Sequence, residues 1–501
     1  MDLDRDACYR ALRARDARFD GRFFVAVRTT GIYCRPICPA PSARRENVVF
    51  FPTAAAAQEA GFRPCLRCRP ECSPDVAAWR GTSNTVSRAL ALIADGGLDG
   101  SDAGVEALSL RLGIGDRQLR RLFRQHLGAS PIAVAQTRRV LFAKQLIHET
   151  RMRMIDVALA AGFSSLRRFN DTFRRLYGRP PSLLRRETGA AAVVERSGIT
   201  LTLSYAAPYD WPAIVSFLAA RAIPGVEAVE AGRYRRSIEL GGCQGTVEIA
   251  PLPRRHALAA TIRFADVKAL PAIVARLRSV FDLGSDVRAI AAQLAEDPHL
   301  APLVAARPGL RVPGAWDGFE LAVRAVLGQQ VTVAAARQLA GKLAAAYGTP
   351  LAGTTETALT TVFPGPERLV SADLAALGMP RARAAALSAL AAAAAADPSL
   401  FQPDGDLDSA VARLSALPGI GGWTAQYIAL RALREPDAFP AADIGLLRAM
   451  TGPDGVRPTP ATLLARAEAW RPWRAYAAQH LWTSDAATVR SRPPSTREDV
   501  A

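Results

Sequence analysis

The stretch LSALPGIGGWTAQYIALRAL, residues 414–433, decides the architecture of the C-terminal half of the chain. Two apolar helical segments flank Leu-Pro-Gly-Ile-Gly-Gly, and this order predicts a helix-hairpin-helix. Gly419, Gly421 and Gly422 permit a tight turn. Its backbone N–H groups would lie at the N-terminus of the second helix and bind a DNA phosphate without reading sequence. Many non-catalytic proteins use this pattern as an anchor, so it predicts contact with DNA and leaves open whether a reaction follows.

Outward from the hairpin, the next informative residue is Asp443, in FPAADIGLLRAM (residues 439–450). Asp443 follows Trp423 by 20 residues and precedes an apolar helical run. An acidic residue in that position is typical of a helix N-cap. Position alone therefore favours a structural role for Asp443.

Alanine-rich and leucine-rich helical stretches surround these two motifs, and a different composition precedes them. Alternating segments such as YRRSIEL and GTVEIAP predict strands around the helical stretch WPAIVSFLAARA. We therefore expect a small α+β domain over residues 196–283 and a helical domain over residues 284–485. Residues 486–501 are expected to form a disordered tail.

Residues 205–482 resemble the AlkA family of bacterial alkylbase DNA glycosylases through PYDW, ARPGLRVPG, DGFELAVRAVLGQQVTVAAA, LPGIGGWTAQY and RPWRAYAAQHLW. The resemblance implies an enzyme that flips a damaged nucleotide out of the duplex and hydrolyses its N-glycosidic bond. The family's catalytic aspartate matches Asp443, whose carboxylate would stabilise oxocarbenium character on the sugar while water attacks. Ala442 stands where a close relative carries a second acidic residue, so no other carboxylate competes for this role.

The resemblance also implies an aromatic pocket for cationic N-alkylated bases. Electron-rich rings attract such bases by stacking and cation–π interaction worth about 0.5 to 2 kcal/mol. Trp423, Tyr427 and Trp482 match that pocket, although core packing is the commoner role of any one aromatic residue. Gln329 matches a glutamine of this region. Gln330 stands where the family inserts an apolar side chain into the gap left by the flipped base.

Two further expectations come from the same resemblance. The family binds a monovalent or similar cation through hairpin carbonyl groups, which match those of Ser415, Leu417 and Ile420. Bifunctional relatives carry a lysine in the motif, whereas Trp423 and Gln426 stand in this region here. A cationic base is a good leaving group that needs no strong general acid, so a monofunctional glycosylase is implied.

An internal repeat lies in the preceding part of the chain. LFRQHLGASP (residues 122–131) returns 50 residues later as TFRRLYGRPP (residues 172–181), and each copy follows a helix, a glycine-containing turn and a second helix. Helix, short turn and basic helix are typical of a helix-turn-helix, whose second helix enters the major groove. A helical bundle with solvated arginines would explain one copy, but the duplication favours DNA binding. The side chains expected to face DNA are Arg117, Arg120, Arg121, Arg124, Arg167, Arg168 and Asn170.

The segment IDVALAAGFSSLRRFNDTFRRLYGRPP resembles the second helix-turn-helix of the AraC family, and residues 84–187 match that family's two-unit DNA-binding domain. The resemblance implies sequence-specific binding to double-stranded DNA. A transcriptional activator of this kind also implies RNA polymerase as a partner.

Four cysteines near the N-terminus form two close pairs, Cys34-x3-Cys38 and Cys65-x2-Cys68. Two such pairs can complete a tetrahedral zinc site, with each pair on a tight turn. Cys72 is an alternative ligand in place of Cys68, although C-x-x-C is the commoner spacing. Spacing alone favours a structural zinc that stabilises a small domain over residues 1–76.

The stretches DGRFFVAVRTTGIYCRPICPA and RRENVVFFPTAAAAQEAGFRPCLRCRP resemble the N-terminal zinc domain of the Ada family. In that family the first of the four cysteines also accepts a methyl group from an alkylated DNA phosphate, and this residue matches Cys34. Zinc would keep its sulfur a thiolate, which is the nucleophilic form. The arginines expected to attract the phosphate backbone are Arg35, Arg44, Arg45 and Arg67.

Overall charge agrees with a polyanionic partner. The 501 residues include 63 Lys plus Arg and 46 Asp plus Glu, which gives a formal net charge of +17. No run of about 18 apolar residues is present and the N-terminus is polar, so we expect no membrane span and no secretory signal. We expect a monomeric, mainly α, multidomain protein with α+β parts, associated with the nucleoid in the bacterial cytoplasm.

Together these resemblances imply a fusion protein that senses alkylation, regulates transcription and excises 3-methyladenine-type bases. Two alternatives stay open. In one, the C-terminal half binds damaged DNA without catalysis and the protein is only a regulator. In the other, the zinc is purely structural and the N-terminal half serves to recruit a glycosylase to DNA.

Overall fold

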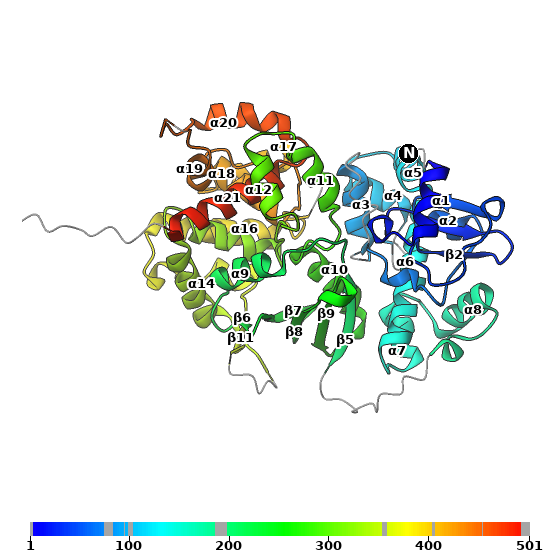
Figure 1. Cartoon of the computed structure of the whole chain (residues 1–501). Coiled ribbons are helices and arrows are strands. Elements are labelled where there is room, and N and C mark those ends of the chain that lie inside the picture. Colours follow the sequence, from blue (N-terminus) through cyan, green and yellow to red (C-terminus); the bar gives the residue numbers. More distant parts are fainter. Residues whose placement is uncertain are drawn as a thin grey trace, which may run out of the picture.

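The computed structural model describes residues 4–74, 84–94, 96–98, 104–185, 198–352, 358–402, 406–452 and 454–491. The N-terminal third lies on one side of a central sheet, and a helical domain lies on the other (Figure 1). Within the described residues no helix is both long enough and apolar enough to cross a membrane. The domain order is that expected from the sequence.

The N-terminal module, residues 4–74, is built on a small sheet with the strand order β3-β1-β2-β4. Its elements are α1 (Arg5–Ala14), β1 (Phe24–Val27), β2 (Ile32–Cys34), β3 (Val48–Phe51), α2 (Ala54–Glu59) and β4 (Arg63–Pro64). Strands β2 and β4 run parallel, with Tyr33 opposite Pro64. Cys34 and Cys65 follow these two residues, so the sheet brings the two halves of the cysteine motif together.

Two helix-turn-helix units follow, as the repeat predicts. The helices are α3 (Asn84–Ala94), α4 (Val105–Arg111), α5 (Asp116–Leu127), α6 (Pro131–Glu149), α7 (Met154–Ala160) and α8 (Leu166–Tyr177). Helices α5 and α8 end in the same way, at Gly128 (φ 69°) and Gly178 (φ 68°), because a left-handed C-cap favours glycine. The long helix α6 joins the two units.

The α+β domain is a five-stranded antiparallel sheet with the order β5-β9-β8-β7-β6. Its elements are β5 (Ile199–Ser204), α9 (Trp211–Arg221), β6 (Glu227–Glu230), β7 (Arg233–Leu240), β8 (Cys243–Leu252), β9 (Ala257–Phe264) and α10 (Leu270–Val280). Its core is continuous with that of the second helix-turn-helix unit, because Phe169 and Phe173 belong to the same buried cluster as Leu201 and Ile249. The two units therefore pack as one body.

Helices make up most of the C-terminal domain. They are α11 (Val287–Leu294), α12 (Leu300–Ala306), α13 (Gly318–Leu327), α14 (Val333–Tyr347), α15 (Pro366–Val370), α16 (Arg381–Ala396), α17 (Leu407–Ser415), α18 (Gly422–Arg431), α19 (Ile444–Ala449), α20 (Pro460–Ala467) and α21 (Arg474–Ser491). A short ladder pairs β10 (Thr349–Pro350) with β11 (Thr361–Val362). Helix α21 extends to Ser491, so residues 486–491 are helical and not part of the expected tail; residues 492–501 lie outside the described residues.

Buried polar contacts connect the N-terminal module to α6. The ammonium group of Lys144 donates to the carbonyl of Cys65 at 2.8 Å and to Oε2 of Glu71 at 2.7 Å, and both charged side chains are almost fully buried. Glu149, at the end of the same helix, accepts from Nη2 of Arg69 at 2.8 Å. A buried lysine needs such a partner, so the N-terminal module has a fixed position on the helix-turn-helix region.

Candidate metal centre and catalytic pocket

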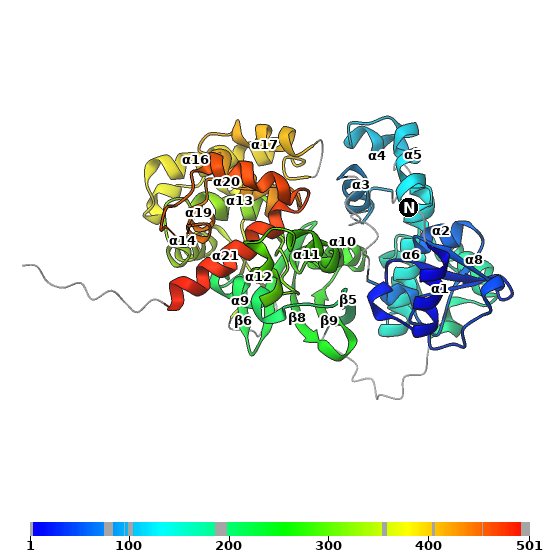
Figure 2. The ribbon, with the colours of Figure 1, turned by 45° about the horizontal axis from the view of Figure 1, so that its top comes forward.

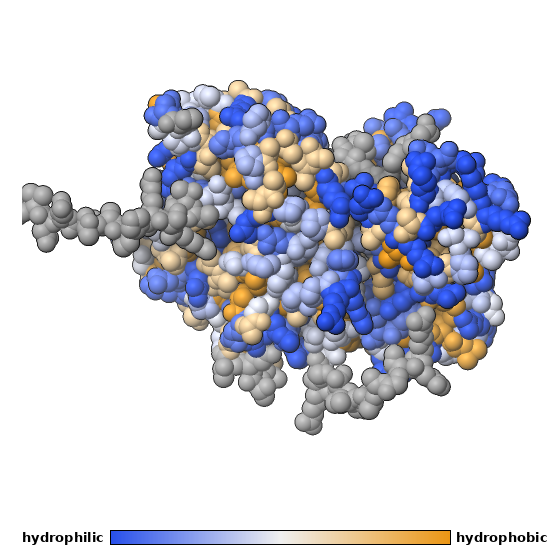
Figure 3. Space-filling model, in the orientation of Figure 1, coloured by the Kyte–Doolittle hydropathy of each residue, from blue (hydrophilic) through white to orange (hydrophobic). Residues whose placement is uncertain are grey.

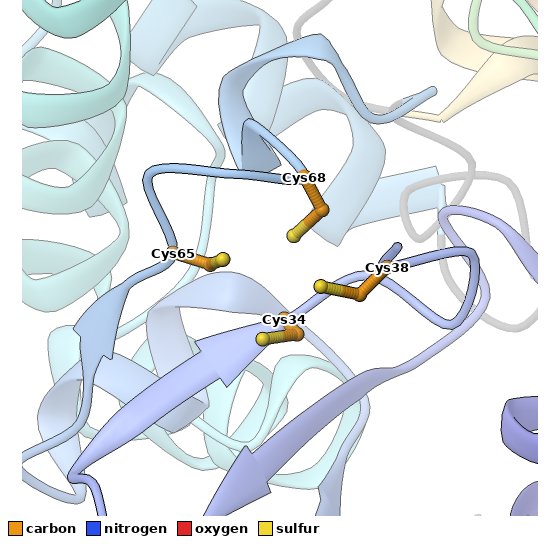
Figure 4. Close-up of side chains that lie close together, drawn as sticks. All are labelled: Cys34, Cys38, Cys65 and Cys68. Carbon is orange, nitrogen blue, oxygen red and sulfur yellow. The ribbon is translucent and has the colours of Figure 1, made fainter. Parts of the chain in front are cut away.

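The thiols of Cys34, Cys38, Cys65 and Cys68 converge on one point, with their Sγ atoms all within 4.8 Å of one another (Figure 4). A tetrahedral zinc with Zn–S bonds of about 2.3 Å requires sulfurs roughly 3.8 Å apart, and this cluster needs little adjustment to meet that. The backbone N–H of Arg35 donates to Sγ of Cys68, and that of Arg67 donates to Sγ of Cys65, both at 3.3 Å. Four thiols with N–H donors directed at two of the sulfurs fit zinc.

Cys72 does not belong to the cluster. Its thiol lies 4.0 Å from Oε1 of Glu149, and burial raises its pKa to about 11. The alternative with Cys72 as a ligand in place of Cys68 is therefore wrong. Within the cluster Cys34 is half-buried, whereas the other three cysteines are 5 to 6% exposed. Taken as a whole residue, Cys34 is the most exposed of the four.

The arginines expected around the cluster differ in their surroundings. Arg44 and Arg67 are exposed, and exposed Arg45 pairs with Asp6. Arg35 is turned inward: its guanidinium pairs with Asp20 and donates from Nη1 to the carbonyl of Cys68 at 3.2 Å. Arg35 thus supports the loop that carries the cysteines. The sequence places Arg35 next to Cys34 but does not predict its contacts with Asp20 and Cys68.

The first basic helix, α5, presents Arg117 and Arg121 to solvent. Exposed Arg120 lies 3.5 Å from Asp116, one turn earlier. Arg124 forms an ion pair within the protein, because its Nη1 atom donates to Oε2 of Glu59 in the N-terminal module at 2.7 Å. In Figure 3 strongly hydrophilic residues gather on the side of the molecule that carries α1 and α5.

The second basic helix, α8, begins at an N-cap formed by Ser165, whose hydroxyl accepts from the backbone N–H of Arg168 at 3.2 Å. Arg167 and Arg168 are exposed, and Asn170 is half-buried. The nearest anionic partner of Arg167 is Asp171, at 3.9 Å. This helix therefore offers its basic face to a partner, as the sequence predicts.

Asp443 caps α19 and also faces two tryptophans. Its Oδ1 atom accepts from the backbone N–H of Leu446 at 3.1 Å and from Nε1 of Trp482 at 2.8 Å. Its Oδ2 atom accepts from Nε1 of Trp423 at 2.8 Å. Three N–H donors match an ionised carboxylate, which only accepts hydrogen bonds. The N-cap role and a catalytic role are thus compatible in one residue.

The three aromatic residues expected in the pocket do lie together. The rings of Trp423 and Tyr427 are stacked, with centroids 5.4 Å apart and planes 7° apart, and Trp482 meets Tyr427 edge-on at 6.2 Å. All three are half-buried. Nη1 of buried Arg431 donates to the hydroxyl of Tyr427 at 2.9 Å. Burial is the largest single influence and acts to raise the pKa of Tyr427, but the guanidinium groups of Arg431, Arg221 and Arg324 together outweigh it, so the pKa is lowered.

Gln329 contacts the hairpin beside the expected pocket, and its role in the pocket stays a prediction. Its amide donates to the carbonyl of Gly419 at 2.9 Å and to Oγ1 of Thr424 at 3.0 Å, so it holds the α13–α14 turn against the hairpin. Gln330, on the same turn, is exposed and has a φ of 56°. The hairpin turn also contains the carbonyl groups of Leu417 and Ile420, and the cation expected there stays a prediction.

Sequence reasoning missed Gly445, two residues after Asp443. A Cβ atom at this position would lie 3.0 Å from Oδ1 of Asp443 and 3.2 Å from Cδ1 of Trp482. The absence of a side chain lets Trp482 reach the carboxylate. A glycine inside a helix costs about 1 kcal/mol relative to alanine, and this was the signal available in the sequence.

Four family models match the chain in order: the metal binding domain of Ada (residues 7–71), a helix-turn-helix domain (108–187), the AlkA N-terminal domain (200–317) and the HhH-GPD superfamily of base excision DNA repair proteins (323–475). The "probable bifunctional transcriptional activator/DNA repair enzyme AlkA" of Mycobacterium tuberculosis is 44% identical over 99% of this chain and 100% of its own length. The "DNA-3-methyladenine glycosylase 2" of Escherichia coli is 39% identical over 57% of this chain and 97% of its own.

Among solved structures, a 3-methyladenine DNA-glycosylase from Archaeoglobus fulgidus matches with a TM-score of 0.51 and 22% identity. The match covers 57% of this chain and 98% of that one. At this identity the likeness shows the fold of the C-terminal half alone.

Proposed function

The chain belongs to the family of bifunctional transcriptional activators and DNA repair enzymes represented by the AlkA protein of Mycobacterium tuberculosis, and on this premise we propose that it senses DNA alkylation, activates transcription and excises alkylated bases. One observation supports the excision activity above all: each oxygen of the Asp443 carboxylate accepts a hydrogen bond from a tryptophan of the aromatic pocket, Trp423 or Trp482.

Base excision follows from this arrangement. The backbone N–H groups near Gly421 and Gly422 bind a DNA phosphate, and the flipped cationic base enters beside the rings of Trp423 and Tyr427. As the C1′–N bond breaks, its electron pair moves to the base and neutralises it, while positive charge grows on the sugar. The carboxylate of Asp443 stabilises that charge. Water then adds to C1′ and loses a proton, so no acid is needed for the leaving group.

Alkylation sensing rests on Cys34. When zinc is bound, it keeps the cluster's sulfurs in the thiolate form. The thiolate of Cys34 attacks the methyl carbon of a DNA methylphosphotriester, so that an S–CH3 bond forms, the O–CH3 bond breaks and a phosphodiester anion leaves. The product is a neutral thioether, so the cluster repels the DNA backbone less and binding tightens. Each chain accepts one methyl group. The position of Cys34 as the half-buried member of the cluster supports this role.

The two helix-turn-helix units supply promoter recognition through the exposed arginines of α5 and α8. Activation at a promoter involves RNA polymerase. We place the protein in the bacterial cytoplasm as a monomer on the nucleoid. A monovalent cation at the carbonyl groups of Ser415, Leu417 and Ile420 would add to phosphate binding at the hairpin.

Two measurements test the proposal. In the first, free 3-methyladenine released from alkylated duplex DNA is quantified for the native chain and for Asp443→Asn. We expect the native chain to release 3-methyladenine and the Asp443→Asn variant to release none. If neither protein releases the base, the C-terminal half only binds damaged DNA and the protein is a regulator.

In the second, zinc-loaded protein is incubated with methylphosphotriester DNA, and the peptide containing Cys34 and Cys38 is fragmented in a mass spectrometer. We expect one methyl group on Cys34. An unmodified peptide with zinc bound would make the zinc purely structural.

A further inference from the structure

The segment between α18 and α19, residues 432–443, carries Asp443 at its end and is held at several points within the glycosylase half. Arg434 donates from Nη2 to Oδ1 of Asp282 at 2.6 Å, and Nε of Arg474 donates to Oδ1 of Asp437 at 2.8 Å. Two further hydrogen bonds hold the segment: Phe439 N–H to Oε1 of Gln426 at 2.9 Å, and Ala475 N–H to the carbonyl of Pro436 at 2.9 Å. The position of Asp443 therefore depends on several contacts along the segment that precedes it.

One anchor of this segment comes from the regulatory half of the protein. Arg88, on α3 of the first helix-turn-helix unit, donates from Nε and Nη2 to Oε1 of Glu435 at 3.1 and 3.0 Å. The side chains of Arg88 and Glu435 are 9% and 5% exposed. In two orientations α3 lies where the N-terminal modules meet the C-terminal half (Figures 1 and 2). The contact joins a DNA-reading module to the segment that ends at the catalytic aspartate.

The ion pair between Arg88 and Glu435 is buried, so its two charges depend on each other. Burial raises the pKa of Glu435, and Arg88 acts in the opposite direction. Asp437 and Asp406, the N-cap of α17, are the other carboxylates whose charge acts on Glu435. Removing Arg88 would take away a cation that donates two hydrogen bonds to this buried carboxylate, and binding a proton or turning toward water would become more favourable for Glu435. Protonation or rotation of Glu435 would disturb the segment 432–443 at a point eight residues before Asp443. The segment is short and is held by several hydrogen bonds, so we expect the disturbance to reach Asp443.

We propose that Arg88 is a positioning residue of the glycosylase, supplied by the helix-turn-helix module: it neutralises Glu435 and so fixes the segment that presents Asp443 to the sugar. The inference rests on the proposed excision activity. Base excision then depends on how the DNA-reading module sits against the glycosylase, because a shift of the carboxylate by about 1 Å costs roughly 100-fold in rate. Arg88 does not touch the substrate.

The test compares variants of the full chain by single-turnover release of 7-methylguanine from a duplex. Arg88→Met is expected to lower the rate constant at saturating enzyme by about 10-fold or more, while the dissociation constant for an abasic-site duplex changes by less than about 3-fold. Arg88→Met combined with Glu435→Gln is expected to return to within about 3-fold of the native rate, because a neutral amide needs no cation.

A matched control is Arg111→Met, which removes an exposed contact with Gln402 at the same junction and leaves the segment untouched. This variant should excise at the native rate. A native rate in Arg88→Met, or a double variant as slow as the single one, would overturn the inference. Absence of excision by the native chain would instead contradict the proposed function, so the two failures are distinguishable.

Discussion

Trp482 donates its indole N–H to Oδ1 of Asp443 at 2.8 Å, across 39 residues of sequence. Trp423 makes the equivalent contact with Oδ2, also at 2.8 Å. The same two indoles border the aromatic pocket with Tyr427. The groups proposed to hold a cationic base are therefore the groups that orient the carboxylate, so we expect base binding and stabilisation of the sugar cation to be coupled.

Trp482→Phe should lower the single-turnover rate of 3-methyladenine release by about 10-fold to 100-fold. The phenyl ring keeps most of the aromatic surface, but it cannot donate to Asp443, and a hydrogen bond to a charged group is worth about 1.5 to 3 kcal/mol. Trp211→Phe is the matched control, because that indole donates to the carbonyl of Gly232 at 3.1 Å in the α+β domain. Equal rates for the two variants would show that the N–H contact with Asp443 has no catalytic role.

Gly445→Ala should reduce excision by about 10-fold without unfolding the domain. The new Cβ atom would meet Oδ1 of Asp443 at 3.0 Å and Cδ1 of Trp482 at 3.2 Å, so one of these groups must shift by a few tenths of an ångström. Alanine also favours a helix relative to glycine by about 1 kcal/mol, which opposes any loss of stability. The measurement is the excision rate together with the thermal midpoint. A native rate in this variant would mean that the site tolerates the shift.

The features that the sequence could predict are those set by local chemistry. The repeat ending at Gly128 and Gly178 predicted two similar units because a left-handed helix end demands a glycine wherever it occurs. The spacing of the cysteines fixed two tight turns and hence a metal site. Trp423, Tyr427 and Trp482, the aromatic residues that the resemblance grouped around Asp443, do lie together in the structure.

The features that escaped prediction depend on partners far away in the sequence. Arg124 belongs to a basic helix face, yet Glu59 of another module neutralises it. Gln329 follows α13 as the resemblance requires, but its amide is bound by the hairpin 90 residues later. Pairing across such distances is decided by how modules pack, and periodicity carries no information about it.

Cys68→Ser should lower the zinc content from about one ion per chain to near zero, whereas Cys72→Ser should retain the ion. The sulfur of Cys68 lies in the four-sulfur cluster, and that of Cys72 lies outside it against Glu149. Zinc per chain can be measured by mass spectrometry of the metal after gel filtration. Loss of zinc from both variants would place Cys72 among the groups that the site requires.

The stability of the glycosylase half should fall as the pH is lowered from about 6.5 to 4, and His480 should account for a defined part of that loss. His480 is 8% exposed on α21, and burial lowers its pKa to about 4. Between these pH values the unfolded chain binds a proton at this histidine and the folded chain does not, so acid favours unfolding. Lowering this pKa from 6.5 to about 4 corresponds to roughly 3 kcal/mol of unfolding free energy at pH 4.

His480→Gln removes this titration while keeping a polar side chain at the site. Six of the seven tryptophans lie at residue 211 or beyond, so tryptophan fluorescence in urea follows the C-terminal half. The variant is expected to lose about 3 kcal/mol less than the native chain between pH 7 and pH 4. The carboxylates titrate in both proteins, and their contribution cancels in the comparison. Equal losses in the two proteins would mean that His480 is protonated in the folded state, and that its burial against α12 does not exclude the charge.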